Sequence, residues 1–462
     1  MNDIFSWLES NQTQLLGQLS ELVAIPCISP GGKCQAELSQ AAAWVAESLR
    51  GAGLPMVKVF PGKDRKRGSE TDADIVYGEW LVDPQQPTVL FYSHYDVQPV
   101  DAEHWVNKDP FQLRTEGGRA IGRGSQDDKG GFVAQLAVME AYRALGKKPP
   151  VNVKFILEGL EEVGSPFLPA FMEQERELLA ADAMVITDTE NVDFGSPALT
   201  YSLRGCLTLF VTVRSAKYPS HSGTTGGGLA DSATALVMLL SRLFPGGSVN
   251  ALPGLYDDVR KLSGEETVML SSLDPTSETL RSRFGVRDGV QLASGPGEFM
   301  INTTRKPTIT IIQLKAGSMS APSNQVLSEA QAVVSVRLVA DQDPARVTDY
   351  IRSVLTKDVP WNVDVQVEPR EAGVRAWMTE PTADIFNTAM QALETGYQKP
   401  AKFMGCGGTI GYVGPAAKTL GCEPLLFGIS GGNAHSHEEF LDLADWLRLQ
   451  KSIAAFLQGL SN

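Results

Sequence analysis

Cysteine and basic side chains are both scarce in this chain. Its 462 residues contain five cysteines, which are scattered and form no CxxC pair. This usage is typical of a reducing compartment rather than of a disulfide framework. Lys and Arg total 40 against 54 Asp and Glu, which gives a formal charge of -14. Because an acidic protein repels phosphate backbones and anionic lipid, we expect no nucleic-acid or membrane partner.

Long apolar runs are missing as well. No uninterrupted apolar segment approaches bilayer-spanning length, and the first residues lack the basic and apolar regions of a secretory signal. We therefore expect a cytoplasmic protein. Hydrophobic residues still make up 43% of the chain, which is enough to bury a sizeable core. At roughly 100 to 200 residues per domain, the length predicts two or three domains, and we expect two.

Four short apolar runs predict buried strands of a largely parallel sheet, because their apolar residues are nearly continuous. They lie at residues 88–96, 151–162, 183–188 and 424–435. Helical spacing of apolar residues is found at residues 4–25, 38–52, 129–145 and 382–397. The pattern favours an α/β domain. Each predicted strand ends in a carboxylate or a histidine, and ligands of open α/β sheets bind at that edge.

The middle of the chain has a different pattern. Several of its predicted strands alternate apolar with polar residues, which suits a sheet with one face open or covered by only two helices. These strands lie at residues 207–213, 308–314, 331–338 and 363–367, with helices at residues 229–243 and 344–355. We predict an inserted α+β domain at residues 199–376, between the two parts of the α/β domain at residues 1–198 and 377–462. Residues 244–302 are predicted to form an elaborated loop region.

Histidines and acids stand where the predicted parallel strands end. His94 and Asp96 are two residues apart on one strand, so their side chains point to the same side. Alone, such a pair is more often a hydrogen-bonded core or rim histidine than a metal site. Asp127 lies between a glycine-rich loop and a helix, where an acid can simply cap the helix. Glu161 and Glu162 end a very apolar strand, where either compensating cations or a solvated turn would tolerate them.

Together these groups predict a metal centre. Separate segments supply three carboxylates and two imidazoles, namely His94, Asp127, Glu162, Asp188 and His435. Ligands of these types suit Zn, Mn or Co. Five ligands are too many for one catalytic zinc, but they fit two ions that share a carboxylate. Such a pair of ions activates a bridging water. Glu161, with no metal of its own, is placed to accept the proton of that water. Asp96 is placed to hydrogen-bond and orient His94.

Seven motifs in family order carry a resemblance to known enzymes. They are SHYDVQP, GRGSQDDKGG, LEGLEEVGS, ITDTE, YPSHSG, VSVRLV and GGNAHS, and they span residues 93–436. The chain resembles the M20 metallopeptidase family, most closely its carnosinase-like dipeptidase branch. The resemblance implies that the five residues above bind two metal ions, with Asp127 bridging, Asp96 orienting and Glu161 as the general base. It also implies a cis peptide between Asp127 and Asp128. At the position of Asp188 the dipeptidase and aminopeptidase members have Asp, whereas other members have Glu.

The same resemblance implies a role for the middle domain. In the family this domain is a ferredoxin-like lid and dimerisation domain, so a homodimer is expected. His221 matches a histidine that reaches the active site of the partner subunit and stabilises the oxyanion. Arg337 matches an arginine that pairs with a substrate carboxylate, and Asn324 is a further candidate for polar substrate contact. Without the resemblance, His221 is an ordinary loop histidine, and Arg337 is equally an edge-strand charge.

One stretch departs from the family pattern. Relatives often carry Arg-Glu-Gly-Gly-Ser/Thr before the final histidine, whereas residues 404–410 read MGCGGTI here. Gly407, Gly408 and Thr409 keep the backbone and hydroxyl donors that would receive a substrate carboxylate. Cys406 replaces the acid, which leaves the substrate specificity open but does not affect the metal centre.

The sequence therefore predicts a dinuclear hydrolase that cleaves the amide bond of dipeptides or short peptides. Zinc is the expected metal, with Mn or Co as alternatives. A second reading is an amidase that removes N-acyl or N-carbamoyl groups from amino acids by the same water activation. A third is a catalytically silent binding subunit. This third reading predicts a missing ligand or base, and none is missing.

Overall fold

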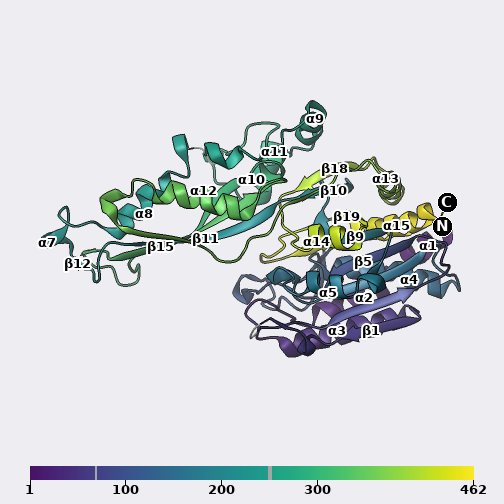
Figure 1. Cartoon of the computed structure of the whole chain (residues 1–462). Coiled ribbons are helices and arrows are strands. Elements are labelled where there is room, and N and C mark those ends of the chain that lie inside the picture. Colours follow the sequence, from purple (N-terminus) through teal and green to yellow (C-terminus); the bar gives the residue numbers. More distant parts are fainter. Residues whose placement is uncertain (68–69, 248–251, 462) are drawn as a thin grey trace. The chain divides into compact units, whose positions relative to one another are not determined.

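The computed structural model describes residues 1–67, 70–247 and 252–461 and forms two compact units (Figure 1). The first unit contains Met1–Tyr201, Thr379–Met404 and Ile410–Asn462, and the second contains Ser202–Met378 and Gly405–Thr409. The loop at residues 405–409 thus groups with the second unit, although the predicted domain boundaries assign it to the first. The predicted catalytic and lid roles of these units remain predictions. Among the described residues, none of the helices has the length and apolar character needed to cross a membrane.

The first unit is built on a sheet with the strand order β1-β4-β8-β5-β9-β19-β10. The strands are β1 Met56–Phe60, β4 Ile75–Trp80, β5 Thr88–His94, β8 Asn152–Glu158, β9 Ala183–Glu190, β10 Ala198–Leu203 and β19 Glu423–Ile429. The four neighbours β8, β5, β9 and β19 run parallel. They are the four strands predicted from continuous apolar runs, and every residue of β8 is buried. This confirms the predicted α/β class with its mainly parallel sheet.

Helices cover this sheet and complete the core of the first unit. They include α1 Asn2–Ser10, α2 Gln12–Val23, α3 Gln35–Gly51, α4 Lys129–Ala144, α13 Asp384–Tyr397 and α15 Leu443–Leu460. Their apolar side chains join one buried cluster with those of the strands. The prediction of a single helix at residues 4–25 is wrong. The backbone leaves the helical conformation at Asn11, which separates α1 from α2. The Asn11 side-chain amide donates to the Trp7 carbonyl at 2.7 Å, a local bond that competes with helix continuation.

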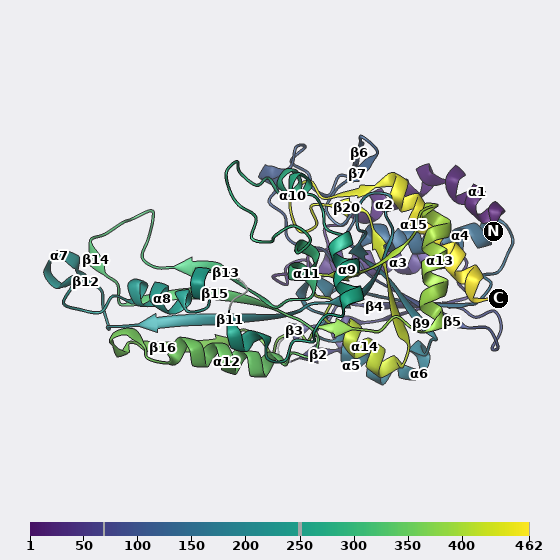
Figure 2. The ribbon, with the colours of Figure 1, turned by 90° about the horizontal axis from the view of Figure 1, so that it is seen from above.

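The second unit contains an antiparallel sheet with the order β13-β15-β11-β16 (Figure 2). Its strands are β11 Gly205–Arg214, β13 Thr308–Lys315, β15 Glu329–Leu338 and β16 Asp364–Pro369, and its two sheet-covering helices are α8 Ser232–Ser241 and α12 Pro344–Thr356. Along the chain these elements follow the βαββαβ order of ferredoxin-like folds. Alternate residues of β15 are buried, and they join α8 and α12 in a single apolar cluster. The predicted alternation thus reflects a sheet covered by helices on one face.

The elaborated loop region predicted at residues 244–302 contains short helices that the sequence does not predict. The segment contains α9 Gly264–Ser272 and α10 Ser277–Phe284, and α11 Phe299–Thr304 begins within it. Residues 248–251 lie outside the described part of the chain. The hydroxyl of Ser263 accepts from the N–H of Glu266, and that of Thr276 from the N–H of Thr279. These side-chain caps begin two short helices within a segment whose composition is typical of loops.

Candidate metal centre

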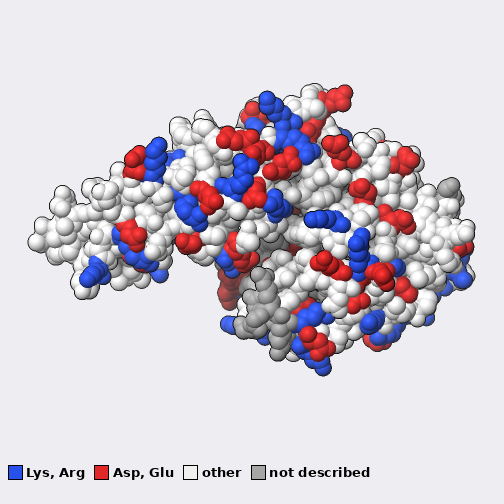
Figure 3. All heavy atoms as spheres, viewed as in Figure 1, with Lys and Arg blue, Asp and Glu red and all other residues white. Residues whose placement is uncertain are grey.

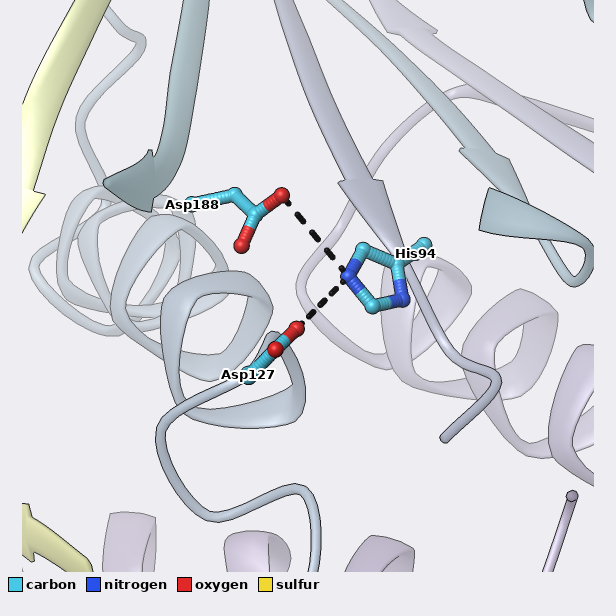
Figure 4. A group of neighbouring side chains, drawn as sticks. All are labelled: His94, Asp127 and Asp188. Carbon is cyan, nitrogen blue, oxygen red and sulfur yellow. Dashed lines mark ion pairs between the residues drawn. The ribbon is translucent and has the colours of Figure 1, made fainter. Parts of the chain in front are cut away.

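Three of the predicted ligands meet where β5 and β9 end (Figure 4). His94 is the last residue of β5, Asp188 lies near the end of β9, and Asp127 lies just before α4. The Nε2 atom of His94 is 3.0 Å from Asp127 Oδ1 and 3.9 Å from Asp188 Oδ2. Because β5 and β9 are neighbouring parallel strands, their ends present these side chains at the same edge of the sheet.

The other two predicted ligands gather around the second oxygen of Asp127. His435 Nε2 is 3.0 Å from Asp127 Oδ2 and 3.1 Å from Glu162 Oε2. The five residues therefore form two groups of three that share Asp127. One carboxylate with an oxygen in each group is the arrangement that two bridged metal ions require.

The ring of His94 is oriented as a metal ligand would be. Its Nδ1 lies 3.1 Å from the carbonyl oxygen of Asp96 and 3.3 Å from Asp96 Oδ1. With the proton assigned to Nδ1, the Nε2 lone pair points toward Asp127 and Asp188. Nε2 is buried and has no hydrogen-bond partner among the described residues. A divalent cation would satisfy this nitrogen, so the donor set fits a metal.

The electrostatics of the site also fit bound cations. Burial raises the pKa of Asp188 well above its usual range, and the charge of Asp127 raises it further. Burial raises the pKa of Asp128 to about 7 and raises the pKa of Glu161 more than nearby His94 lowers it. Burial alone would raise the pKa of Asp127, but the adjacent imidazoles of His435 and His94 outweigh burial and lower it. Crowded buried carboxyl groups resist ionisation unless positive charge is supplied, and divalent ions supply it.

Asp96 connects His94 to the turn that carries both glutamates. Its carboxylate is fully buried and accepts from the Ser29 hydroxyl at 2.6 Å. It also accepts from the backbone N–H groups of Glu161 at 3.2 Å and Glu162 at 3.1 Å. One buried carboxylate therefore fixes the position of the histidine at the end of β5 and of the short 3-10 turn Glu161–Val163 after β8.

A buried ion pair lies beneath Asp127, and no pattern in the sequence predicts it. Glu439 accepts from the backbone N–H groups of Gln126 at 3.0 Å and Asp127 at 3.2 Å. It also pairs with Arg123 at 2.6 Å, and both side chains are almost fully buried. Arg123 in turn donates to the carbonyl of Ser436, next to the last predicted ligand, at 3.0 Å. The pair thus ties together two loops that carry ligands.

The remaining predicted site residues lie in the second unit, in two separate groups. His221 and Asn324 are exposed beside the small sheet of β12 Ser220–His221 and β14 Gln325–Val326. The Nδ1 atom of His221 accepts from the N–H of Gly223 at 3.0 Å. Arg337 lies near the C-terminal end of β15 and donates to the Thr409 hydroxyl at 2.8 Å. Gly408, next to Thr409 in the sequence, is exposed. The structure therefore brings Arg337 and Thr409 together, but not with His221 and Asn324.

A comparison with protein-family models decides the family. The model described as Peptidase family M20/M25/M40 matches residues 90–459, which is most of the chain. The chain belongs to this peptidase family. The predicted membership is therefore confirmed, and membership in this family implies the use of divalent metal ions. The peptide bond between Asp127 and Asp128 is cis, as the resemblance implied.

This M20 family member is similar over its full length to proteins that are named dipeptidases. The Cys-Gly metallodipeptidase dug1 of Schizosaccharomyces pombe is 28% identical, over 100% of this chain and 98% of the relative. The Beta-Ala-His dipeptidase of Rattus norvegicus is also 28% identical, over 100% of this chain and 96% of the relative. Among solved structures, the dipeptidase Dug1p of Saccharomyces cerevisiae matches with a TM-score of 0.88 and 25% identity, over 100% of this chain and 98% of that chain.

Proposed function

We propose that this M20 family member is a dipeptidase that works with two divalent metal ions per chain, with zinc as the expected metal. The observation that best supports two metal ions is the position of the Asp127 carboxylate. One of its oxygens faces His94, and the other faces His435. The relatives support the substrate class, because the fission yeast enzyme is named for Cys-Gly and the rat enzyme for Beta-Ala-His. Both names describe dipeptides.

The proposed chemistry assigns a separate task to each group. When bound, the two ions would activate a water molecule and polarise the scissile carbonyl. Glu161 belongs to neither group of three ligands, so its carboxylate is left to accept a proton and pass it to the leaving amine. Asp96 keeps Glu161 in place through the backbone N–H of that residue. Glu161 therefore acts as the general base, and Asp96 as a positioning residue.

The second unit is proposed to bind the substrate. Arg337 offers a planar guanidinium beside the Thr409 hydroxyl, a combination suited to a peptide carboxylate. The backbone N–H of Gly408 is proposed as an additional donor, and Asn324 as a polar contact. His221 accepts from the Gly223 N–H through Nδ1, which leaves its Nε2 atom to donate to an oxyanion in the active site of a second copy.

A homodimer through the second unit is part of this proposal. β13 is an edge strand of its sheet and exposes Leu314, while α8 exposes Val237. Leu314→Lys is expected to shift the protein from dimer to monomer in sedimentation equilibrium, because a buried charge at an interface is costly. Val268→Lys, at an exposed valine on α9, is the matched control and should leave the mass unchanged. A wild-type chain that sediments as a monomer would remove the dimer from the proposal.

The proposed partners and location rest on charge and cysteine usage. On the face shown in Figure 3, acidic and basic side chains are interspersed. We therefore propose a small peptide, rather than a nucleic acid, as the ligand. Cys27, Cys34, Cys206 and Cys422 form no disulfide, which suits the predicted cytoplasmic location.

A hydrolysis panel tests the proposed function against its alternatives. Dipeptides, tripeptides and N-acyl amino acids should be compared with Zn, Mn and Co in turn. We expect dipeptides to give the highest kcat/KM, activity to disappear with a chelator, and metal analysis to find about two ions per chain. A preference for N-acyl amino acids would establish the amidase, which the named full-length relatives do not support. Fewer than about one ion per chain would revive the silent binding subunit.

A further inference from the structure

Two arginines of the second unit lie on the same side of its sheet. Arg337 on β15 is directly opposite Cys206 of β11 and Thr308 of β13. Its neighbours Val336 and Leu338 are buried in the cluster with α8 and α12, so the Arg337 side chain projects from the opposite face. Arg204 lies just before β11, and its Nη1 atom donates to the Thr308 hydroxyl at 3.2 Å. Its guanidinium group therefore contacts the residue that lies directly opposite Arg337.

Both arginines hold the loop at residues 405–409. The Nε atom of Arg204 donates to the Gly407 carbonyl at 3.1 Å, and its backbone N–H donates to the Cys406 carbonyl at 3.3 Å. The Thr409 hydroxyl accepts from Arg337 and donates to the Arg204 carbonyl at 2.7 Å. The two guanidinium groups are therefore fixed beside one short loop.

These two charges lack a counter-ion within the described part of the chain. Among the described residues, the two guanidinium groups donate to carbonyl and hydroxyl oxygens, and neither forms an ion pair with a carboxylate. Both side chains are half-buried. Burial and the neighbouring charge of Arg337 lower the pKa of Arg204 to about 10. Two like charges that are partly removed from water cost free energy, which an anionic ligand would recover.

We propose that Arg204 and Arg337 form a two-arginine subsite that selects dipeptides with a C-terminal Asp or Glu. This inference rests on the proposed dipeptidase function and names its substrate class. Arg337 receives the terminal carboxylate, and the remaining N–H groups of Arg204 receive the side-chain carboxylate, because guanidinium groups bind carboxylates with paired hydrogen bonds. Gly407 leaves room for this contact. A Cβ atom there would lie 3.1 Å from Arg204 Nη2 and 2.7 Å from the Thr303 carbonyl.

The test compares Ala-Glu with Ala-Gln, which have nearly the same shape but differ by one charge. The metal-loaded wild-type enzyme is expected to show a kcat/KM for Ala-Glu about tenfold above that for Ala-Gln. Arg204→Gln should bring this ratio close to one, while Arg204→Lys should keep part of it because the charge remains. Arg346→Gln is the matched control, since its exposed side chain pairs with Asp258 elsewhere in the unit, and it should keep the wild-type ratio.

The outcomes separate this inference from the proposed function. Equal rates for the two dipeptides in wild type, or an unchanged ratio in Arg204→Gln, would overturn the subsite while leaving the dipeptidase intact. If Arg204→Gln does not fold, Gly407→Ala takes its place, and the ratio should again fall. If neither dipeptide is cleaved, the proposed function fails, and calorimetry with glutarate decides the subsite. Weaker glutarate binding by Arg204→Gln than by Arg346→Gln supports it, and equal binding overturns it.

Discussion

Replacing Glu161 by Gln is expected to lower kcat by about 10²- to 10⁴-fold, the range associated with loss of a general acid or base. The amide cannot accept the proton that the mechanism assigns to the carboxylate. Metal content and KM should stay near wild-type values, because Glu161 belongs to neither group of three ligands and the Asp96 contact uses its backbone N–H. Steady-state kinetics combined with metal analysis of the same preparation would measure both effects.

The neighbouring glutamate gives a sharp comparison. Glu162→Gln makes the same chemical change one residue away, but it alters the group that contains His435. We expect this variant to lose metal as well as turnover. Glu177→Gln, at an exposed position on α6 Arg176–Leu179, should change neither quantity. Near-normal turnover in Glu161→Gln would exclude Glu161 as the base, even if all metal sites remained filled.

Much of the fold could be predicted because local patterns determine it. The continuous apolar runs predicted β5, β8, β9 and β19, since strands buried on both faces need apolar residues at nearly every position. Alternation predicted the strands of the second unit. The break at Asn11 and the helices α9 and α10 were not predicted, because each depends on a side-chain bond to the backbone that composition does not reveal.

The candidate site could be predicted only in part, for a related reason. Strand ends identified residues such as His94 and Asp188, because parallel strands converge on one edge. Glu439 could not be predicted in this way. It accepts a hydrogen bond from Asp127, which is 312 residues away in the sequence, and no pattern distinguishes it from the adjacent Glu438. The backbone of His435 adopts a left-handed conformation with a φ of 61°, which no sequence signal indicates. Long-range contacts of this kind became visible only in three dimensions.

Asp127→Asn is expected to remove most of both metal ions and to lower turnover by at least about 10³-fold, because both ions take part in the proposed chemistry. The asparagine keeps one oxygen but places an amide nitrogen toward one of the two imidazoles, and an amide nitrogen is not a metal ligand. Metal content should fall from about two ions per chain to below one. In thermal unfolding, added zinc should raise the Tm of the wild-type protein but have little effect on this variant.

Asp188→Asn is the matched control for this prediction, because Asp188 belongs only to the group that contains His94. It is expected to keep about one ion per chain, at the group formed by Asp127, Glu162 and His435. A larger metal loss in Asp127→Asn than in Asp188→Asn therefore measures the sharing of one carboxylate by two groups. If the two variants retained the same amount of metal, Asp127 would serve a single ion, and the dinuclear centre would have to be abandoned.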